Sequence, residues 1–105
     1  MKIDLNELTN QVSESSQIKK MAKTQKIQYD PAYPNKWNAA FIVYCEEFME
    51  DVPLSITIEI NDDEYFTFSM DSTHSSCKDK KVPLKFLPGF IERLVLEVAE
   101  PWRTA

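Results

Sequence analysis

The residue types best suited to catalysis are concentrated in one polar stretch, residues 71–80, which reads DSTHSSCKDK. It contains His74, the only histidine of the chain, and Cys77 three positions later. A general base next to a thiol could generate a nucleophile, so a small enzyme centred on these two residues is one hypothesis. A nucleophile and its base must be oriented by distant elements, however, and the stretch has no nucleophile-elbow motif. We therefore expect a polar loop with a solvated histidine and assign no catalytic residue.

The residue types also argue against a metal ion or a cofactor. A zinc site at His74 and Cys77 would need two further ligands, and only Asp71 and a distant acid are available. The acidic run at 62–64 lacks the alternating oxygen ligands and the glycine of a calcium loop. The chain contains a single glycine, Gly89, whereas P-loops and dinucleotide-binding fingerprints need several. We expect no metal site, no cofactor and no nucleotide-dependent reaction of these types.

The stretch 33–52 combines the densest acidity with the clearest apolar pattern. Taken as a helix, it gathers an apolar stripe within about 100° of arc, formed by Trp37, Phe41, Tyr44, Cys45 and Phe48. Residues 41–45 alone have a strand-like composition, but the stripe continues to Phe48, so the sequence predicts a helix that ends at Pro53. Acids in its last turns would meet the negative end of the helix dipole and destabilise it by roughly a few tenths of a kcal/mol each. Their placement is therefore the leading functional clue.

Further along the chain the apolar period changes to two, which predicts antiparallel strands. Residues 54–70 form a predicted hairpin. A three-residue loop at 61–63 would pair Ile58 with Phe66 and place both apolar sets on one face. Residues 82–86 alternate in the same way and give a third strand, which its proline confines to an edge.

Helices are predicted before and after this sheet. A helix with an N-cap is predicted from about residue 4 to 13, and a last helix follows Pro88. The apolar phase breaks at a serine-rich gap, so residues 1–28 hold either two short helices or one frayed helix, with a brief strand at 26–29. The fold class is α+β in the order ααβββα, a three-stranded antiparallel meander with the helices packed on one sheet face. Residues 1–105 form one small domain, in which 1–28 is a loosely packed helical segment.

The charge is uneven along the chain, although its net value is only −5. Residues 1–28 contain five lysines and three acids, whereas residues 29–105 contain seven basic and fourteen acidic residues. This acidity disfavours direct nucleic-acid binding, which depends on neutralising phosphates, and favours a basic partner surface. The strand at 54–60 runs back from the central helix, so the acids before and after it are expected at opposite ends of the domain. The predicted partner-binding residues are Glu46, Glu47, Glu50, Asp51, Asp62, Asp63 and Glu64.

The sequence favours a cytoplasmic location. The longest apolar runs stop far short of the ~20 residues that span a bilayer. The first ten residues carry acids where a signal peptide would need a basic start and an apolar run. Cys45 and Cys77 suit a reducing compartment as free thiols, and a disulfide between them stays an open alternative.

The leading functional hypothesis is a non-catalytic acidic interaction protein that binds a basic surface of a partner protein, for example one that handles nucleic acid. A phage-type inhibitor that mimics nucleic acid is a specific form of it. The second hypothesis is an assembly subunit that forms a homodimer or larger homo-oligomer through Val43, Leu96 or the edge strand. The third is the enzyme at His74 and Cys77, and the fourth is nucleic-acid binding by the lysines at 19–26. Candidate exposed aromatic anchors are Tyr29, Tyr33, Tyr65 and Trp102.

Overall fold

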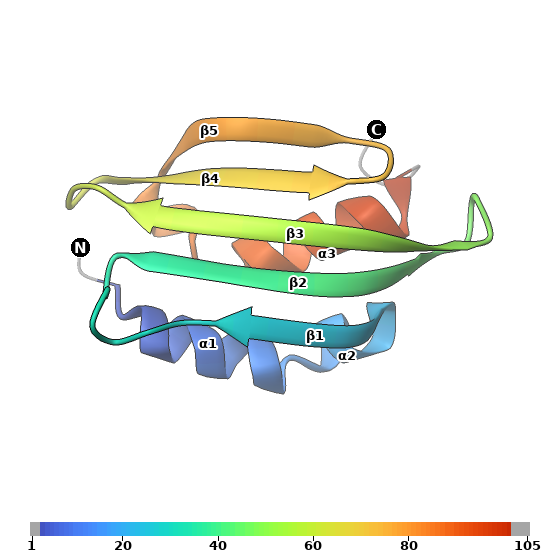
Figure 1. The fold of residues 1–105 in the computed structure, drawn as a ribbon, viewed down its shortest axis with the longest axis horizontal. Helices are drawn as coiled ribbons and strands as arrows, with labels where there is room; N and C mark the ends of the chain where they lie inside the picture. Colours follow the sequence, from blue (N-terminus) through green and yellow to red (C-terminus); the bar gives the residue numbers. More distant parts are fainter. Residues whose placement is uncertain (1–2, 102–105) are drawn as a thin grey trace.

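A computed structural model describes residues 3–101 and shows an α+β fold built on a five-stranded antiparallel sheet. Two helices precede the sheet, α1 (Leu5–Glu14) and α2 (Ser16–Met21). The strands are β1 (Ala22–Gln28), β2 (Lys36–Cys45), β3 (Glu50–Ile60), β4 (Tyr65–Ser72) and β5 (Ser76–Pro83). A short 3-10 helix, η1 (Leu84–Phe86), leads to the last helix, α3 (Phe90–Ala99). Each strand pairs with the next, so the sheet is a continuous meander (Figure 1).

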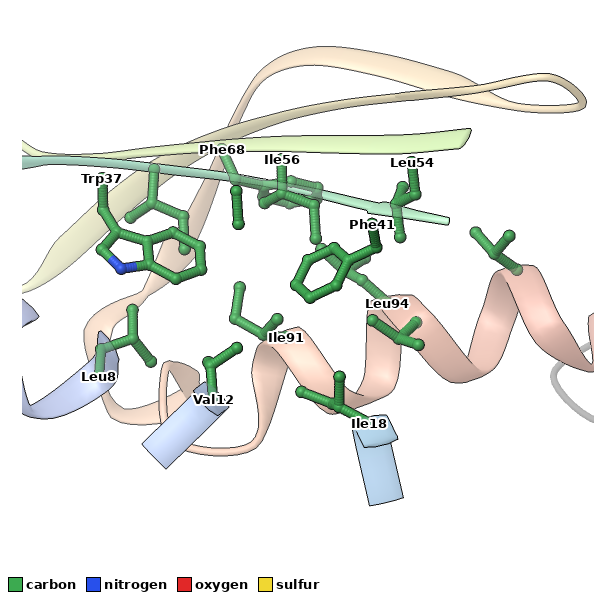
Figure 2. Close-up of a cluster of buried hydrophobic side chains, with 14 of the residues drawn as sticks. Leu8, Val12, Ile18, Trp37, Phe41, Leu54, Ile56, Phe68, Ile91 and Leu94 are labelled. Carbon is green, nitrogen blue, oxygen red and sulfur yellow. The ribbon is translucent and has the colours of Figure 1, made fainter. Parts of the chain in front are cut away.

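One face of the sheet is covered by the helices, and the core lies between the two layers. Every second residue of β2 and β3 is buried, as the alternating side-chain direction of a strand requires. Figure 2 shows side chains of the sheet, among them Trp37 and Phe41, pointing toward Val12 and Ile91 of the helices. The indole N–H of Trp37 donates a hydrogen bond to Thr9 Oγ1 at 3.0 Å, which satisfies the polar group of this buried ring. Each large side chain buried in this way contributes about 1.5–3 kcal/mol.

The prediction of a helix over residues 33–52 is wrong. This stretch forms β2, a tight turn at 46–49 and the start of β3. β2 and β3 pair antiparallel along their lengths, with Trp37 opposite Ile58 and Cys45 opposite Glu50. The stretch is still the centre of the molecule, but as the middle strands of a sheet.

The spacing of the apolar residues explains the error. Trp37, Phe41 and Cys45 are buried as the helix predicted, but a spacing of four residues fits one face of a strand as well, because four is an even number. Tyr44 and Phe48 lie on the helical stripe only, and both are exposed. The β-branched and aromatic composition of residues 41–45 was the more reliable signal.

The β3–β4 hairpin unites its apolar sets on one face as predicted, with a longer loop. Ile58 pairs with Phe68 rather than Phe66, so the register differs by two residues and the faces are preserved. Asp62 Oδ1 accepts hydrogen bonds from the backbone N–H groups of Glu64 at 2.7 Å and Tyr65 at 2.8 Å. This carboxylate stabilises a wider turn than the three-residue loop that was predicted.

The prediction of a three-stranded meander is also wrong, because both edges carry a further strand. Most of the expected polar loop at 71–80 belongs to β4 and β5, and residues 84–86 form η1 instead of a strand. The β5 edge is rich in lysine and has a bulge where Asp79 adopts φ 52°, features that protect an exposed edge from pairing with another chain. At the other edge, β1 extends the brief strand predicted at 26–29 and pairs with β2.

The N-terminal segment forms the two short helices, and the break falls at Ser15. Asp4 caps α1 by accepting a hydrogen bond from Asn6 N–H at 2.9 Å. Ser15 Oγ accepts from Ile18 N–H at 3.2 Å and donates to Glu92 Oε1 at 2.5 Å, which ties α2 to α3. The apolar side chains of both helices are buried, namely Leu5, Leu8, Val12 and Ile18.

The last helix follows Pro88 as predicted, and its Ile91, Leu94, Val95 and Val98 are all buried. Cys45 is buried and Cys77 partly buried, and they are not bonded to each other. No helix between residues 3 and 101 is long and apolar enough to cross a membrane.

Candidate functional site

The predicted partner-binding acids lie at the two opposite ends of β3 (Figure 1). Glu46 and Glu47 belong to the β2–β3 turn, and Glu50 and Asp51 begin β3. The acids at 62–64 belong to the β3–β4 turn. The 11 residues of β3 separate the two sets by roughly 33 Å. We name residues 46–51 the hairpin tip.

The acids of the hairpin tip do not oppose a helix dipole, because no helix ends there. The physical reason that singled them out in the sequence is therefore wrong. Their environment shows a different feature. The turn exposes two large apolar side chains, and the exposed fractions are 50% for Phe48 and 81% for Met49.

Met49 adopts an unusual backbone conformation. Its φ of 52° lies in the left-handed region, which costs a residue with a side chain about 1–2 kcal/mol. Its N–H donates to the carbonyl of Glu46 at 3.3 Å and closes the turn. Met49 is largely exposed and contributes little burial energy to the fold, so it forms, with the half-exposed Phe48, a candidate interaction surface.

The turn between β4 and β5 supports the hairpin tip. The ring of His74 stacks on Phe48 with centroids 4.4 Å apart, and its Nε2 pairs with Glu50 Oε1. From the edge strand β1, Lys23 Nζ pairs with Asp51 at 2.9 Å and lies over the Tyr44 ring. These contacts link the hairpin tip to the β4–β5 turn and to β1.

Glu46 and Glu47 differ from the other two acids of the tip. Both are exposed, and within residues 3–101 their side chains form no ion pair or hydrogen bond. Their charge is not engaged within the described residues, whereas Glu50 contacts His74 and Asp51 forms an ion pair with Lys23.

The residues of the enzyme hypothesis are engaged in other contacts. His74 pairs with Glu50, while Cys77 lies on β5 opposite Met70. The hydroxyl of Ser72 bonds to the carbonyl of Ser75 within the turn. Across the described positions, no three His, Cys, Asp or Glu side chains come close enough to hold a metal ion. The arrangement gives His74 a supporting role at the hairpin tip.

At the other end of β3 the structure contains a cavity of about 570 Å³, which we name the end pocket. Its apolar lining includes Leu5, Ile60 and Leu84, and its acids are Asp4, Asp62 and Asp63. Hydrogen bonds from the backbone N–H groups after Asp62, with the charge of Lys81, hold the pKa of Asp62 below its usual value. Glu64 is exposed beside the pocket and does not line it.

The residues proposed for self-association and as aromatic anchors differ in how exposed they are. Val43, one of the residues proposed for self-association, is buried in the core, and Leu96 is half-buried. Tyr33 is exposed, whereas Tyr29 and Tyr65 are half-buried. Trp102 lies outside the described residues.

The sequence did not predict Phe48 and Met49 as functional residues, because the helical stripe places Phe48 in the core. The signal that could have found them is the presence of two large apolar residues inside the acidic run EEFMED.

Comparison of the chain with models of protein families, with curated proteins and with solved structures found no match. The functional argument therefore depends on the geometry of the two ends of the sheet.

Proposed function

We propose that this protein is a non-catalytic interaction protein that binds a basic partner protein through its hairpin tip. The observation that carries the proposal is the exposure of Phe48 and Met49 in a turn flanked by four acids. Large apolar side chains that become buried on binding supply most of the affinity of protein interfaces. The matching partner surface is an apolar cleft bordered by lysine or arginine.

The acids determine which partners the apolar pair meets. Glu46 and Glu47 have no partner among the described residues, and they belong to a chain of net charge −5. Complementary charge accelerates association and disfavours acidic competitors. Proteins that handle nucleic acid present basic clefts, so a phage-type inhibitor that mimics nucleic acid is a specific form of the proposal. A cytoplasmic location is proposed with it, supported by the two free thiols.

Contacts of neighbouring side chains with the hairpin tip favour tight binding. The contacts of His74 with Phe48 and Glu50, and of Lys23 with Asp51, restrict the tip before a partner arrives. A surface that is already ordered loses less conformational entropy on binding. We therefore expect the hairpin tip to be ordered before a partner binds.

The test uses the protein as bait in extracts of its native host, followed by calorimetry with the purified captured partner. The double variant Phe48→Ala with Met49→Ala removes the anchors, and we expect affinity to fall by about 30-fold or more. The double variant Glu46→Lys with Glu47→Lys reverses the unpaired charges without breaking an ion pair. It should weaken binding most at low salt, where charge interactions are least screened.

The matched control is Glu64→Lys, which reverses an exposed acid at the opposite end of β3 and should leave affinity nearly unchanged. A partner that binds both tip variants as tightly as the original protein would refute the proposal. So would an affinity that stays constant when the salt concentration is raised.

A further inference from the structure

The end pocket has walls from parts of the chain that are distant in sequence: the N-terminus of α1, the β1–β2 connection, the β3–β4 turn and η1. Backbone hydrogen bonds fasten these parts together. Ile60 N–H donates to the carbonyl of Asn35 at 2.9 Å, and Leu84 N–H donates to the carbonyl of Glu64 at 2.8 Å. The volume of about 570 Å³ lies within the usual range of small-molecule sites, about 300–1,000 Å³. The cavity is therefore formed before any ligand arrives.

The lining of the end pocket combines apolar and acidic side chains. The half-buried Ile3, Tyr29 and Ile60 supply its accessible apolar surface, whereas Leu5 and Leu84 are almost fully buried. Asp62 and Asp63 are exposed and stand where the pocket meets solvent. No lysine or arginine belongs to the residues that line it. A complementary ligand has a hydrocarbon part and a positive charge.

The acids of the end pocket retain free acceptor atoms. Asp4 and Asp62 each use Oδ1 to bond the backbone of their own turn. Their Oδ2 atoms, and both oxygens of Asp63, form no hydrogen bond or ion pair within residues 3–101. The pKa of Asp62 lies below its usual value, because its carboxylate accepts hydrogen bonds from the backbone of Glu64 and Tyr65. The three acids do not converge on one point as metal ligands would, since no metal-holding group is found among the described residues.

We propose that the end pocket binds an alkylammonium group, a primary amine on an unbranched hydrocarbon chain. The ammonium donates hydrogen bonds to Asp62 and Asp63, and the chain lies on the half-buried Ile3, Tyr29 and Ile60. Three N–H donors suit carboxylates that surround an opening, and methylene groups suit an apolar lining. This site lies at the opposite end of β3 from the hairpin tip, so it is independent of the proposed function.

The same chemistry occurs in free alkylamines and in lysine side chains, and the test separates these sources. The isotope-labelled protein is titrated with n-pentylamine, with Nα-acetyl-lysine methylamide and with n-pentanol, while amide chemical shifts are recorded. We expect saturable shifts around residues 60–63 and Asn35 with the amine, and a dissociation constant on the order of 1 mM. n-Pentanol has the same chain without the charge and should bind at least about threefold more weakly.

Asp63→Asn is the diagnostic variant, because this exposed side chain has no partner to lose within the described residues and the fold should persist. It should weaken n-pentylamine binding about threefold or more, whereas the matched control Glu47→Gln at the hairpin tip should leave it unchanged. Saturation by the lysine derivative as well as by n-pentylamine supports the proposal and identifies protein lysines as a source. Saturation by n-pentylamine alone supports it and identifies a free amine. The absence of saturable shifts, equal binding of n-pentanol, or an Asp63→Asn variant with unchanged affinity would overturn it.

Discussion

The two ends of the sheet carry similar numbers of acids but arrange them differently relative to apolar surface. At the hairpin tip, the apolar side chains of Phe48 and Met49 project outward and the acids lie around them. At the end pocket, half-buried apolar side chains line a cavity and the acids beside them are exposed. The first arrangement suits insertion into a cavity of the proposed partner, and the second suits the proposed ligand. Net charge alone would not separate these two arrangements.

The two ends also differ in how their acids serve the fold. Asp62 organises its own turn by accepting two backbone hydrogen bonds. Glu46 and Glu47 stabilise nothing that the described residues show, so their charges can be changed at little cost to folding. Mutations should therefore separate stability from binding at the hairpin tip more cleanly than at the β3–β4 turn.

The largest expected effect is on the free energy of unfolding and tests the core of the sheet, whose strand β3 separates the two ends. Trp37→Ala removes a fully buried ring and its hydrogen bond to Thr9, and should lower the free energy of unfolding by about 3–5 kcal/mol. Tyr44→Ala is the control, because Tyr44 projects from the solvent face of the same strand. Its effect should stay within about 1 kcal/mol in the same chemical denaturation experiment, because the variant loses only the contact of Lys23 with the ring. Equal losses for the two variants would favour the helical stripe over the strand.

A second expected effect tests whether the hairpin tip is preorganised. His74→Ala removes the ring stacked on Phe48 and the partner of Glu50, and should weaken partner binding about fivefold. His74→Phe keeps the stacking and loses only the contact with Glu50, so it should recover most of the affinity. Calorimetry with the captured partner measures both. If neither variant changes affinity, the tip does not depend on this support.

A third expected effect separates folding from binding at one residue. Met49→Gly relieves the positive φ and should raise the free energy of unfolding by about 0.5 kcal/mol or more. The same change removes an anchor and should weaken partner binding. Met49→Ala keeps the backbone strain and is the control. Thermal unfolding gives the first quantity, and a glycine variant no more stable than the alanine variant would count against strain at this position.

The smallest expected effect depends on pH and is confined to the β3–β4 turn. The folded pKa of Asp62 lies below its ordinary value of 3.8 because of the backbone hydrogen bonds from Glu64 and Tyr65 and the charge of Lys81. The ionised carboxylate therefore stabilises the fold fully above the unfolded pKa, and this contribution is lost as pH falls through the folded pKa. Asp62→Asn keeps an acceptor and removes the titration. The stability difference between the two proteins should shrink in acid; a difference that is constant with pH contradicts the assignment.

Several elements could be predicted from the sequence because their signals are local. Asp4 and the apolar stripe predicted α1, and the run after Pro88 predicted α3. The alternation of isoleucine and phenylalanine predicted that the β3–β4 loop has an odd number of residues, which places both apolar sets on one face. The separation of the two acidic sets followed from the direction of β3.

Other elements could not be predicted because their signals are ambiguous or absent. The spacing of Trp37, Phe41 and Cys45 fits a helix and a strand equally, so β2 was assigned to the wrong class. Most of β5 lies at an exposed edge, where residues 78–81 are charged and give no apolar alternation. The hairpin tip and the end pocket depend on contacts such as His74 with Phe48 and Asn35 with Ile60, which join residues far apart in the chain.

The continuous meander has a consequence for the order of folding. Each strand pairs with its neighbour in sequence, so the sheet can form by closing short loops, and such local topologies fold fast. The bond between Ser15 and Glu92 instead joins residues 77 positions apart, so docking of the N-terminal helices on α3 brings together distant parts of the chain. We expect Ser15→Ala to accelerate unfolding and leave the refolding rate nearly unchanged in stopped-flow experiments, because the sheet forms first and the helical layer closes over it last.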